Sequence, residues 1–122
     1  MGEVVSGSFD IAFLGNYTKD TIVSAAGTRV LDGGAFNYGA QVAARMGLRT
    51  AAITRLATND WHVIQALADL GVAVHATPTP SSTCLRLEYP STNVDERRIF
   101  LTSTAGSFTP DQVSGVQAQA FV

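Results

Sequence analysis

The sequence contains a single cysteine, Cys84, among its 122 residues. One cysteine excludes a disulfide within the chain and a metal site built from several cysteines. This usage is typical of a reducing compartment and predicts a cytoplasmic protein. His62 and His75 have no second ligand at the spacing of a metal site, so we expect no bound metal in this chain.

Charge and long apolar runs are also scarce. Eight Lys and Arg against ten Asp and Glu give a net charge of -2, and the longest basic run is Arg97-Arg98. We expect no nucleic-acid partner, because such binding needs clustered basic side chains. The apolar stretches fall well short of the roughly 20 residues that a membrane-spanning helix requires, and the first residues lack the pattern of a secretion signal. We therefore expect no membrane partner either.

The residues that are present suffice for a packed core. Hydrophobic residues make up 46% of the chain, and a chain of this size can bury about two-thirds of its unfolded surface. We expect a folded domain or part of a larger one.

Strand-like and helix-like segments alternate along the chain. Expected strands are 9–15, 21–24, 28–31, 49–56, 72–75, 83–89 and 97–102. Expected helices are 36–46, a second that begins after a cap at 58–60 and stops at Gly71, and 109–119. The order favours an α/β fold with a parallel sheet. Because 120–122 resembles the start of another strand, we expect the natural chain to continue beyond Val122.

Segments 83–89 and 97–102 are expected to form a long hairpin. Leu85, Leu87 and Tyr89 alternate with polar residues along the first segment, which predicts one apolar face. A lone hairpin cannot bury such a face, so we expect it to cover a cleft or to pair with a second copy in a homo-oligomer.

The densest functional signal is the run Asp32-Gly33-Gly34-Ala35-Phe36-Asn37-Tyr38-Gly39, between an expected strand and an expected helix. Adjacent glycines let a ligand approach the backbone closely, and free amides at a helix start favour ligand oxygens. The run is not a P-loop, because Ala40-Gln41 replaces the Lys-Ser/Thr pair, and it is not a dinucleotide fingerprint, because Ala35 occupies the second glycine position. From these residues alone, a plain strand-to-helix turn remains the alternative.

This turn and its surroundings resemble the PfkB/ribokinase family of carbohydrate and nucleoside kinases. Gly33 to Asn37, followed by a small-residue helix ending at Gly47, is similar to the family's N-terminal signature, and 15–20 resembles its first strand and the acidic residue after it. The hairpin, at about 83–103, falls where the family has its substrate lid. The spacing from Asn37 to Gly47 is one residue longer than in ribokinase-type members, so the resemblance is to a divergent branch of the family. The resemblance implies that residues 1–122 are the N-terminal part of a ribokinase-like domain, with a parallel sheet, flanking helices and a β-hairpin lid.

The resemblance implies transfer of a phosphoryl group from ATP, with Mg²⁺, to a hydroxyl of a sugar or nucleoside. The Gly-Ala-Gly-Asp turn that carries the family's catalytic base is absent, so catalytic residues are expected after Val122 and the chain alone is expected to be inactive. The implied substrate-binding residues are Asn16, Asp20, Gly33, Gly34 and Asn37. Asp20 is the expected grip on substrate hydroxyls, since one carboxylate can accept two hydrogen bonds from a vicinal diol.

Alternatives remain open for both the residues and the function. Asn16 and Asp20 are also compatible with turn roles, and Asn37 with a local helix cap. At the level of function, the chain is also compatible with a non-catalytic module that binds a sugar or nucleoside, or with an interaction domain that pairs through its hairpin.

Overall fold

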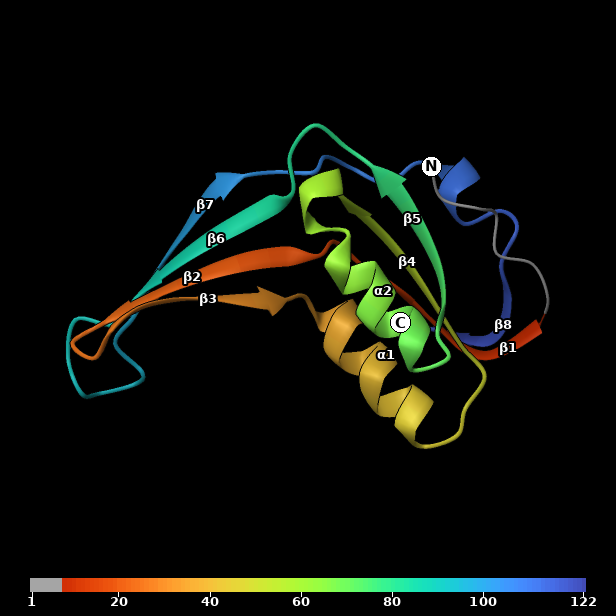
Figure 1. The fold of residues 1–122 in the computed structure, drawn as a ribbon, viewed down its shortest axis with the longest axis horizontal. Helices are drawn as coiled ribbons and strands as arrows, with labels where there is room; N and C mark the ends of the chain where they lie inside the picture. The colour runs from red at the N-terminus through yellow and green to blue at the C-terminus, as the bar shows by residue number, and fades with distance from the viewer. Residues whose placement is uncertain (1–7) are drawn as a thin grey trace.

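The computed structural model describes residues 8–122, which form two four-stranded sheets and two α-helices (Figure 1). The first seven residues of the predicted domain lie outside the described residues. Sheet A has the order β5-β4-β1-β8 and consists of β1 (Ser8–Leu14), β4 (Thr50–Leu56), β5 (Ala73–Pro78) and β8 (Gln117–Phe121). Sheet B has the order β3-β2-β6-β7 and consists of β2 (Thr18–Ser24), β3 (Gly27–Gly33), β6 (Thr83–Glu88) and β7 (Arg98–Ser103).

Sheet A is parallel throughout, which confirms the predicted α/β class. Its central strand β4 is almost completely buried, as expected for an apolar strand with both faces covered. Helices α1 (Ala35–Arg45) and α2 (His62–Asp69) pack on one face, over a core that includes Phe13, Phe36 and Leu67. A smaller cluster around Ile53 and Val116 covers the other face.

Helix α1 lies close to sheet A because its inner face is made of small residues. Ala40 and Ala43 are buried, and a side chain at Gly39 would overlap the ring of Phe13. The predicted small-residue helix therefore forms where the sequence placed it. Neither α-helix in the described part of the chain has the length and apolar character needed to cross a membrane.

Sheet B extends away from sheet A and the two helices (Figure 1). β2 pairs antiparallel with β3 and parallel with β6, and β6 and β7 form an antiparallel hairpin. Leu85 lies opposite Leu101 and Leu87 opposite Ile99, so the apolar side chains share one face as their alternation predicted. The expected hairpin is thus half of a larger sheet.

The helix predicted over 109–119 is wrong. The predicted start signal does form, since the Thr109 N–H donates to Gln112 Oε1 at 2.7 Å, but only a short 3-10 turn, η2 (Pro110–Gln112), follows it. Gln112 Nε2 then donates to Thr77 of β5, and the chain pairs with β1 from Gln117 onward. Ser, Gly and Val at 114–116 have low helix propensity, and the long-range pairing prevails.

The cap predicted at 58–60 also differs. These residues form a 3-10 turn, η1 (Thr58–Asp60), without a side-chain cap hydrogen bond, and α2 begins at His62. Val63 and Leu67 are its buried residues, whereas Trp61 and Ile64 are partly buried and Ala68 is exposed. The capping prediction fails because the Asp60 side chain forms contacts with sheet B instead.

Candidate functional site

The five residues predicted to bind the substrate lie where the chain passes between the two sheets. Asn16 belongs to the connection from β1 to β2, and Asp20 lies on β2. Gly33 ends β3, and Gly34 and Asn37 stand at the start of α1. The structure therefore brings residues from two separate sequence segments, 16–20 and 33–37, to one place.

Both glycines are in close contact with the first of these segments. A Cβ atom at Gly33 would overlap the carboxylate of Asp20, and one at Gly34 would overlap the backbone carbonyl oxygen of Asn16. Gly34 also has φ = 100°, a backbone conformation that residues other than glycine rarely adopt. The absence of a side chain at the two glycines thus lets the Asp20 carboxylate and the Asn16 carbonyl pack directly against the turn.

Asp20 and Asn16 each carry an oxygen that is buried without a partner. Within the described residues, Oδ1 of Asp20 and Oδ1 of Asn16 are both shielded from solvent and accept no hydrogen bond. Buried acceptors are almost always satisfied in folded proteins, because leaving one unpaired costs about 1–3 kcal/mol. Both oxygens lie beside the Gly33-Gly34 turn, and no donor among the described residues satisfies them.

Asn37 is 5% exposed and occupies the first turn of α1. Its backbone N–H donates to the Gly34 carbonyl at 3.0 Å, and its Oδ1 accepts from Gln41 Nε2 at 3.0 Å. The side-chain bond thus runs to Gln41 along the helix, not back to the local backbone as in a helix cap. The amide still has its Nδ2 donor and the second lone pair of Oδ1 with which it can bond a ligand.

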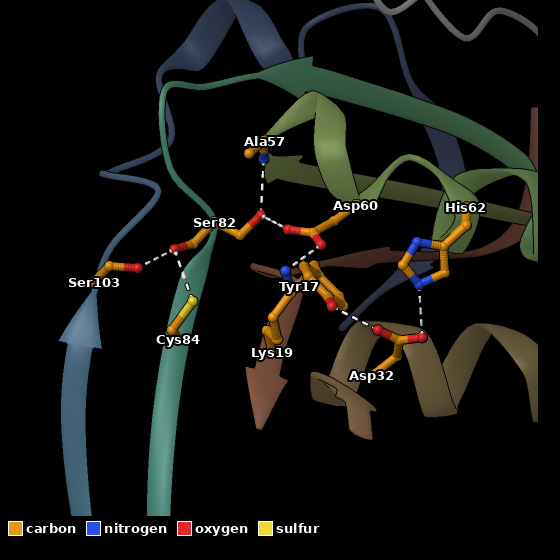
Figure 2. Close-up of polar contacts among 9 residues, drawn as sticks. All are labelled: Tyr17, Lys19, Asp32, Ala57, Asp60, His62, Ser82, Cys84 and Ser103. Atoms are coloured by element: carbon orange, nitrogen blue, oxygen red, sulfur yellow. Dashed lines mark hydrogen bonds and ion pairs between the residues drawn. The ribbon is translucent and has the colours of Figure 1, made fainter. Parts of the chain in front are cut away.

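A polar network lies on the other side of β2 and joins sheet B to the end of β4 (Figure 2). Lys19 Nζ lies 2.5 Å from Asp60 Oδ1, and Ser82 Oγ donates to Asp60 Oδ2 at 2.6 Å. The Ala57 N–H in turn donates to Ser82 Oγ at 2.8 Å. Burial acts to raise the pKa of Asp60, but the hydrogen bonds from Lys19 and Ser82 outweigh it and hold that pKa below its ordinary value. The same contact raises the pKa of Lys19.

A second set of contacts links the two segments of the site directly (Figure 2). The hydroxyl of the fully buried Tyr17 donates to Asp32 Oδ1 at 2.6 Å, and His62 Nε2 lies 2.9 Å from Asp32 Oδ2. Burial, with a further contribution from the Asp32 contact, raises the pKa of Tyr17. Tyr17 follows Asn16 and Asp32 precedes Gly33, so this hydrogen bond fixes the two segments side by side.

Comparison with solved structures identifies the architecture. A pyrophosphate-dependent kinase in the ribokinase family, solved as a sulfate complex, superimposes with a TM-score of 0.81 and 29% identity over 91% of this chain and 39% of that chain. A pyrophosphate-dependent kinase in the ribokinase family, complexed with a pyrophosphate analog and myo-inositol, gives a TM-score of 0.77 and 27% identity over 91% and 38%. This chain resembles the N-terminal part of a ribokinase-family kinase. The resemblance stated from the sequence is confirmed.

More distant ribokinase-like structures share the fold alone. Ribokinase from Cryptococcus neoformans var. grubii serotype A, in complex with ADP, is 17% identical with a TM-score of 0.69, over 86% of this chain and 37% of that chain. No protein-family model and no curated protein matches the sequence. The chain spans about 39% of the length of the first solved relative, so the activity of a whole ribokinase-like protein is considered below as a proposal.

The structure also places three polar residues near the candidate site that the sequence did not indicate as functional, Tyr17, Lys19 and Asp60. Tyr17 and Lys19 lie within segment 15–20, which resembles the family, but the pattern predicts no role for either. Asp60 lies within the predicted helix cap at 58–60. The alternation along β2 was the available signal, because it places the side chains of Lys19 and Asp20 on opposite faces of the sheet. A half-buried ammonium group on its face needs a carboxylate partner. Which carboxylate supplies that partner depends on the three-dimensional path of the chain.

A cavity of about 920 Å³ lies elsewhere, at the far end of sheet B. Its walls come from the β2–β3 turn and the loop between β6 and β7, and none of the predicted acceptor residues contributes to them. Among the described residues, no three His, Cys, Asp or Glu side chains gather into a group that could hold a metal ion.

Proposed function

We propose that this chain forms the acceptor-binding part of a ribokinase-family kinase that phosphorylates a hydroxyl of a small polyol. The observation that carries the proposal is the pair of buried, unpartnered oxygens of Asp20 and Asn16 beside the Gly33-Gly34 turn. Hydroxyl groups are the donors that such oxygens need, and a polyol supplies several of them at short spacing.

Each residue of the site has a defined part in this proposal. The Asp20 carboxylate accepts hydrogen bonds from one or two acceptor hydroxyls, and Asn16 Oδ1 accepts another. Asn37 Nδ2 donates to an acceptor oxygen, and the Gly33-Gly34 backbone lies against the ligand. Phosphoryl transfer depends largely on positioning, so these contacts hold the reacting hydroxyl in place for the donor.

The apolar neighbours of Asp20 favour a ring as the acceptor. Asp20 lies opposite Leu31 on β3 and opposite Leu85 on β6, so its side chain emerges between two aliphatic ones on the same face. A cyclic polyol can direct hydroxyls to the carboxylate and pack its C–H groups on the leucines. Because a solved relative was complexed with myo-inositol, we propose this compound as the first acceptor to test, ahead of sugars and nucleosides.

The donor side is assigned to no residue of this chain. We propose ATP as the donor, as in ribokinase-type enzymes, with pyrophosphate as the alternative raised by the two pyrophosphate-dependent relatives. The described residues offer no acidic cluster for Mg²⁺, and the sequence lacks the Gly-Ala-Gly-Asp turn. We therefore expect residues 1–122 alone to transfer no phosphoryl group.

The test uses the full-length parent protein with Mg²⁺. Myo-inositol, a panel of sugars and a panel of nucleosides are each incubated with ATP or with pyrophosphate, and phosphorylated product is measured. We expect product with a cyclic polyol. Binding of the polyol without turnover with either donor would instead support the non-catalytic binding module, and a folded parent that neither binds nor phosphorylates any of them contradicts the proposal.

A further inference from the structure

Asp60 is a buried carboxylate to which the proposed function gives no role. It is 3% exposed and lies at the end of η1, outside the acceptor site. Both of its oxygens are engaged, one by Lys19 and the other by Ser82. A charged group buried this deeply is rare in proteins unless it is paired, and the identity of its partners indicates what it does.

The first partner connects Asp60 to the strand that carries the acceptor-binding carboxylate. Successive side chains of a strand point to opposite faces, so Lys19 and Asp20 leave β2 in opposite directions. Lys19 extends to Asp60, while Asp20 lies beside Gly33. The contact of the Lys19 ammonium group with Asp60 therefore links the strand that carries Asp20 to η1.

The second partner connects Asp60 to the start of β6 and to the core. Ser82 directly precedes β6, and its Oγ accepts from the N–H of Ala57, the residue after β4. The carbonyl oxygen of Ser82 accepts from Ser103 Oγ at 2.5 Å, which brings in the end of β7 (Figure 2). Three strands of sheet B are thus connected, through Asp60 and Ser82, to the end of the central strand of sheet A.

We propose that Asp60 is a positioning residue for the acceptor. Asp20 belongs to sheet B, whereas Asn16 and Gly34 belong to the segments that join it to the core. The network Lys19–Asp60–Ser82 sets the distance between these groups by holding sheet B against the end of β4. The inference rests on the proposed function, because it concerns the same acceptor.

Two variants of the full-length parent and one control separate positioning from simple stabilisation. Lys19→Met leaves Asp60 buried without a cation and is expected to lower the melting temperature. Adding Asp60→Asn removes the unpaired charge, so the double variant should recover much of that temperature. The connection between β2 and η1 is still missing in the double variant. Its KM for myo-inositol should therefore remain raised by roughly tenfold or more, with the KM of the donor nearly unchanged.

Asp69→Asn is the matched control. Asp69 is an exposed carboxylate on α2 that accepts from Gln65 Nε2, so the same chemical change is made away from sheet B. It should alter neither the melting temperature nor the KM for myo-inositol. If the double variant regains the wild-type KM together with its stability, Asp60 is only a structural residue and the proposal is overturned.

Hydrogen exchange of the same variants gives a readout that needs no activity. Loss of the network should speed exchange at the backbone amides of β2 and β6 and leave those of β1 and β4 unchanged. Unchanged exchange in β2 and β6 would also overturn the proposal. A wild-type parent that does not use myo-inositol contradicts the proposed acceptor alone, since exchange still reports whether Asp60 holds sheet B.

Discussion

At the scale of single residues, Asp20 combines its proposed binding role with a cost to the fold. One of its oxygens is buried and accepts no hydrogen bond from the described residues, which is unfavourable for the fold. Binding groups are often held in this way, because the ligand supplies the missing hydrogen bonds. Asp20 is therefore a residue whose replacement should affect function more than stability.

Asp20→Asn in the full-length parent tests this expectation. The variant keeps the shape of the side chain but loses a charge-assisted hydrogen bond, which contributes about 1.5–3 kcal/mol. We expect kcat/KM for the polyol to fall by ~10-fold or more, with the KM of the donor nearly unchanged and the melting temperature equal or higher. Wild-type kinetics in Asp20→Asn would show that Asp20 is a residue of β2 without a binding role.

Gly34→Ala probes the turn itself. The added Cβ overlaps the Asn16 carbonyl oxygen, and the alanine must also adopt φ = 100°. We therefore expect the free energy of unfolding to fall by about 1–3 kcal/mol. Gly27→Ala is the matched control, since Gly27 has φ = 123° but no atom within 4 Å of the added carbon. Denaturant unfolding of both variants should show a larger decrease in the free energy of unfolding for Gly34→Ala. Equal decreases would mean that the overlap with the Asn16 carbonyl is relieved without destabilising the fold.

At the scale of elements, the Lys19–Asp60 pair makes the junction of the sheets sensitive to pH. The pKa of Asp60 is lowered from an ordinary value of 3.8, so its contribution to stability is present above that pH and is lost as the pH falls through the lowered pKa. The pKa of Lys19 is raised from 10.5, so its contribution is complete below that pH and is lost as the pH rises through the raised pKa. The pair therefore stabilises the fold between these limits.

Asp60→Asn should flatten the acid side of this profile. Melting temperatures measured from pH 7 down to pH 2 should fall less steeply in the variant, because the carboxylate that must be protonated is gone. Asp10 also has a lowered pKa, through hydrogen bonds from Arg49, and remains in both proteins as a source of residual slope. Parallel profiles for the variant and the wild type would show that Asp60 does not contribute to acid unfolding.

Local pattern predicted the elements well where contacts between sequence neighbours decide the structure. Alternation in 83–89 gave the correct face of β6, and the glycine turn gave the start of α1. The helix over 109–119 failed because pairing with β1, a strand about a hundred residues away, decides the structure of 117–121. The contacts of Asp60 could not be predicted for the same reason, since its partners lie at positions 19 and 82.

At the scale of the whole molecule, the face of sheet B that carries Asp20 is apolar, and nothing in the described chain covers it completely. Leu31, Leu85, Leu87, Ile99 and Leu101 share this face with Asp20. Ile99 is 53% exposed and Leu101 is 65% exposed. A bound acceptor near Asp20 can cover only the end of the sheet next to the core, so the outer part needs another partner.

We expect that partner to be the same face of a second copy, related by a two-fold axis. Sedimentation at micromolar concentrations should then show a dimer, and Leu87→Lys should shift the equilibrium toward monomer by placing a charge in the apolar contact. Val30→Lys is the control, because Val30 is 58% exposed and pairs with Thr21, which puts it on the opposite face of the same sheet. A monomer at all concentrations would contradict the expected dimer. A dimer insensitive to Leu87→Lys but dissociated by Val30→Lys would move the contact to the other face.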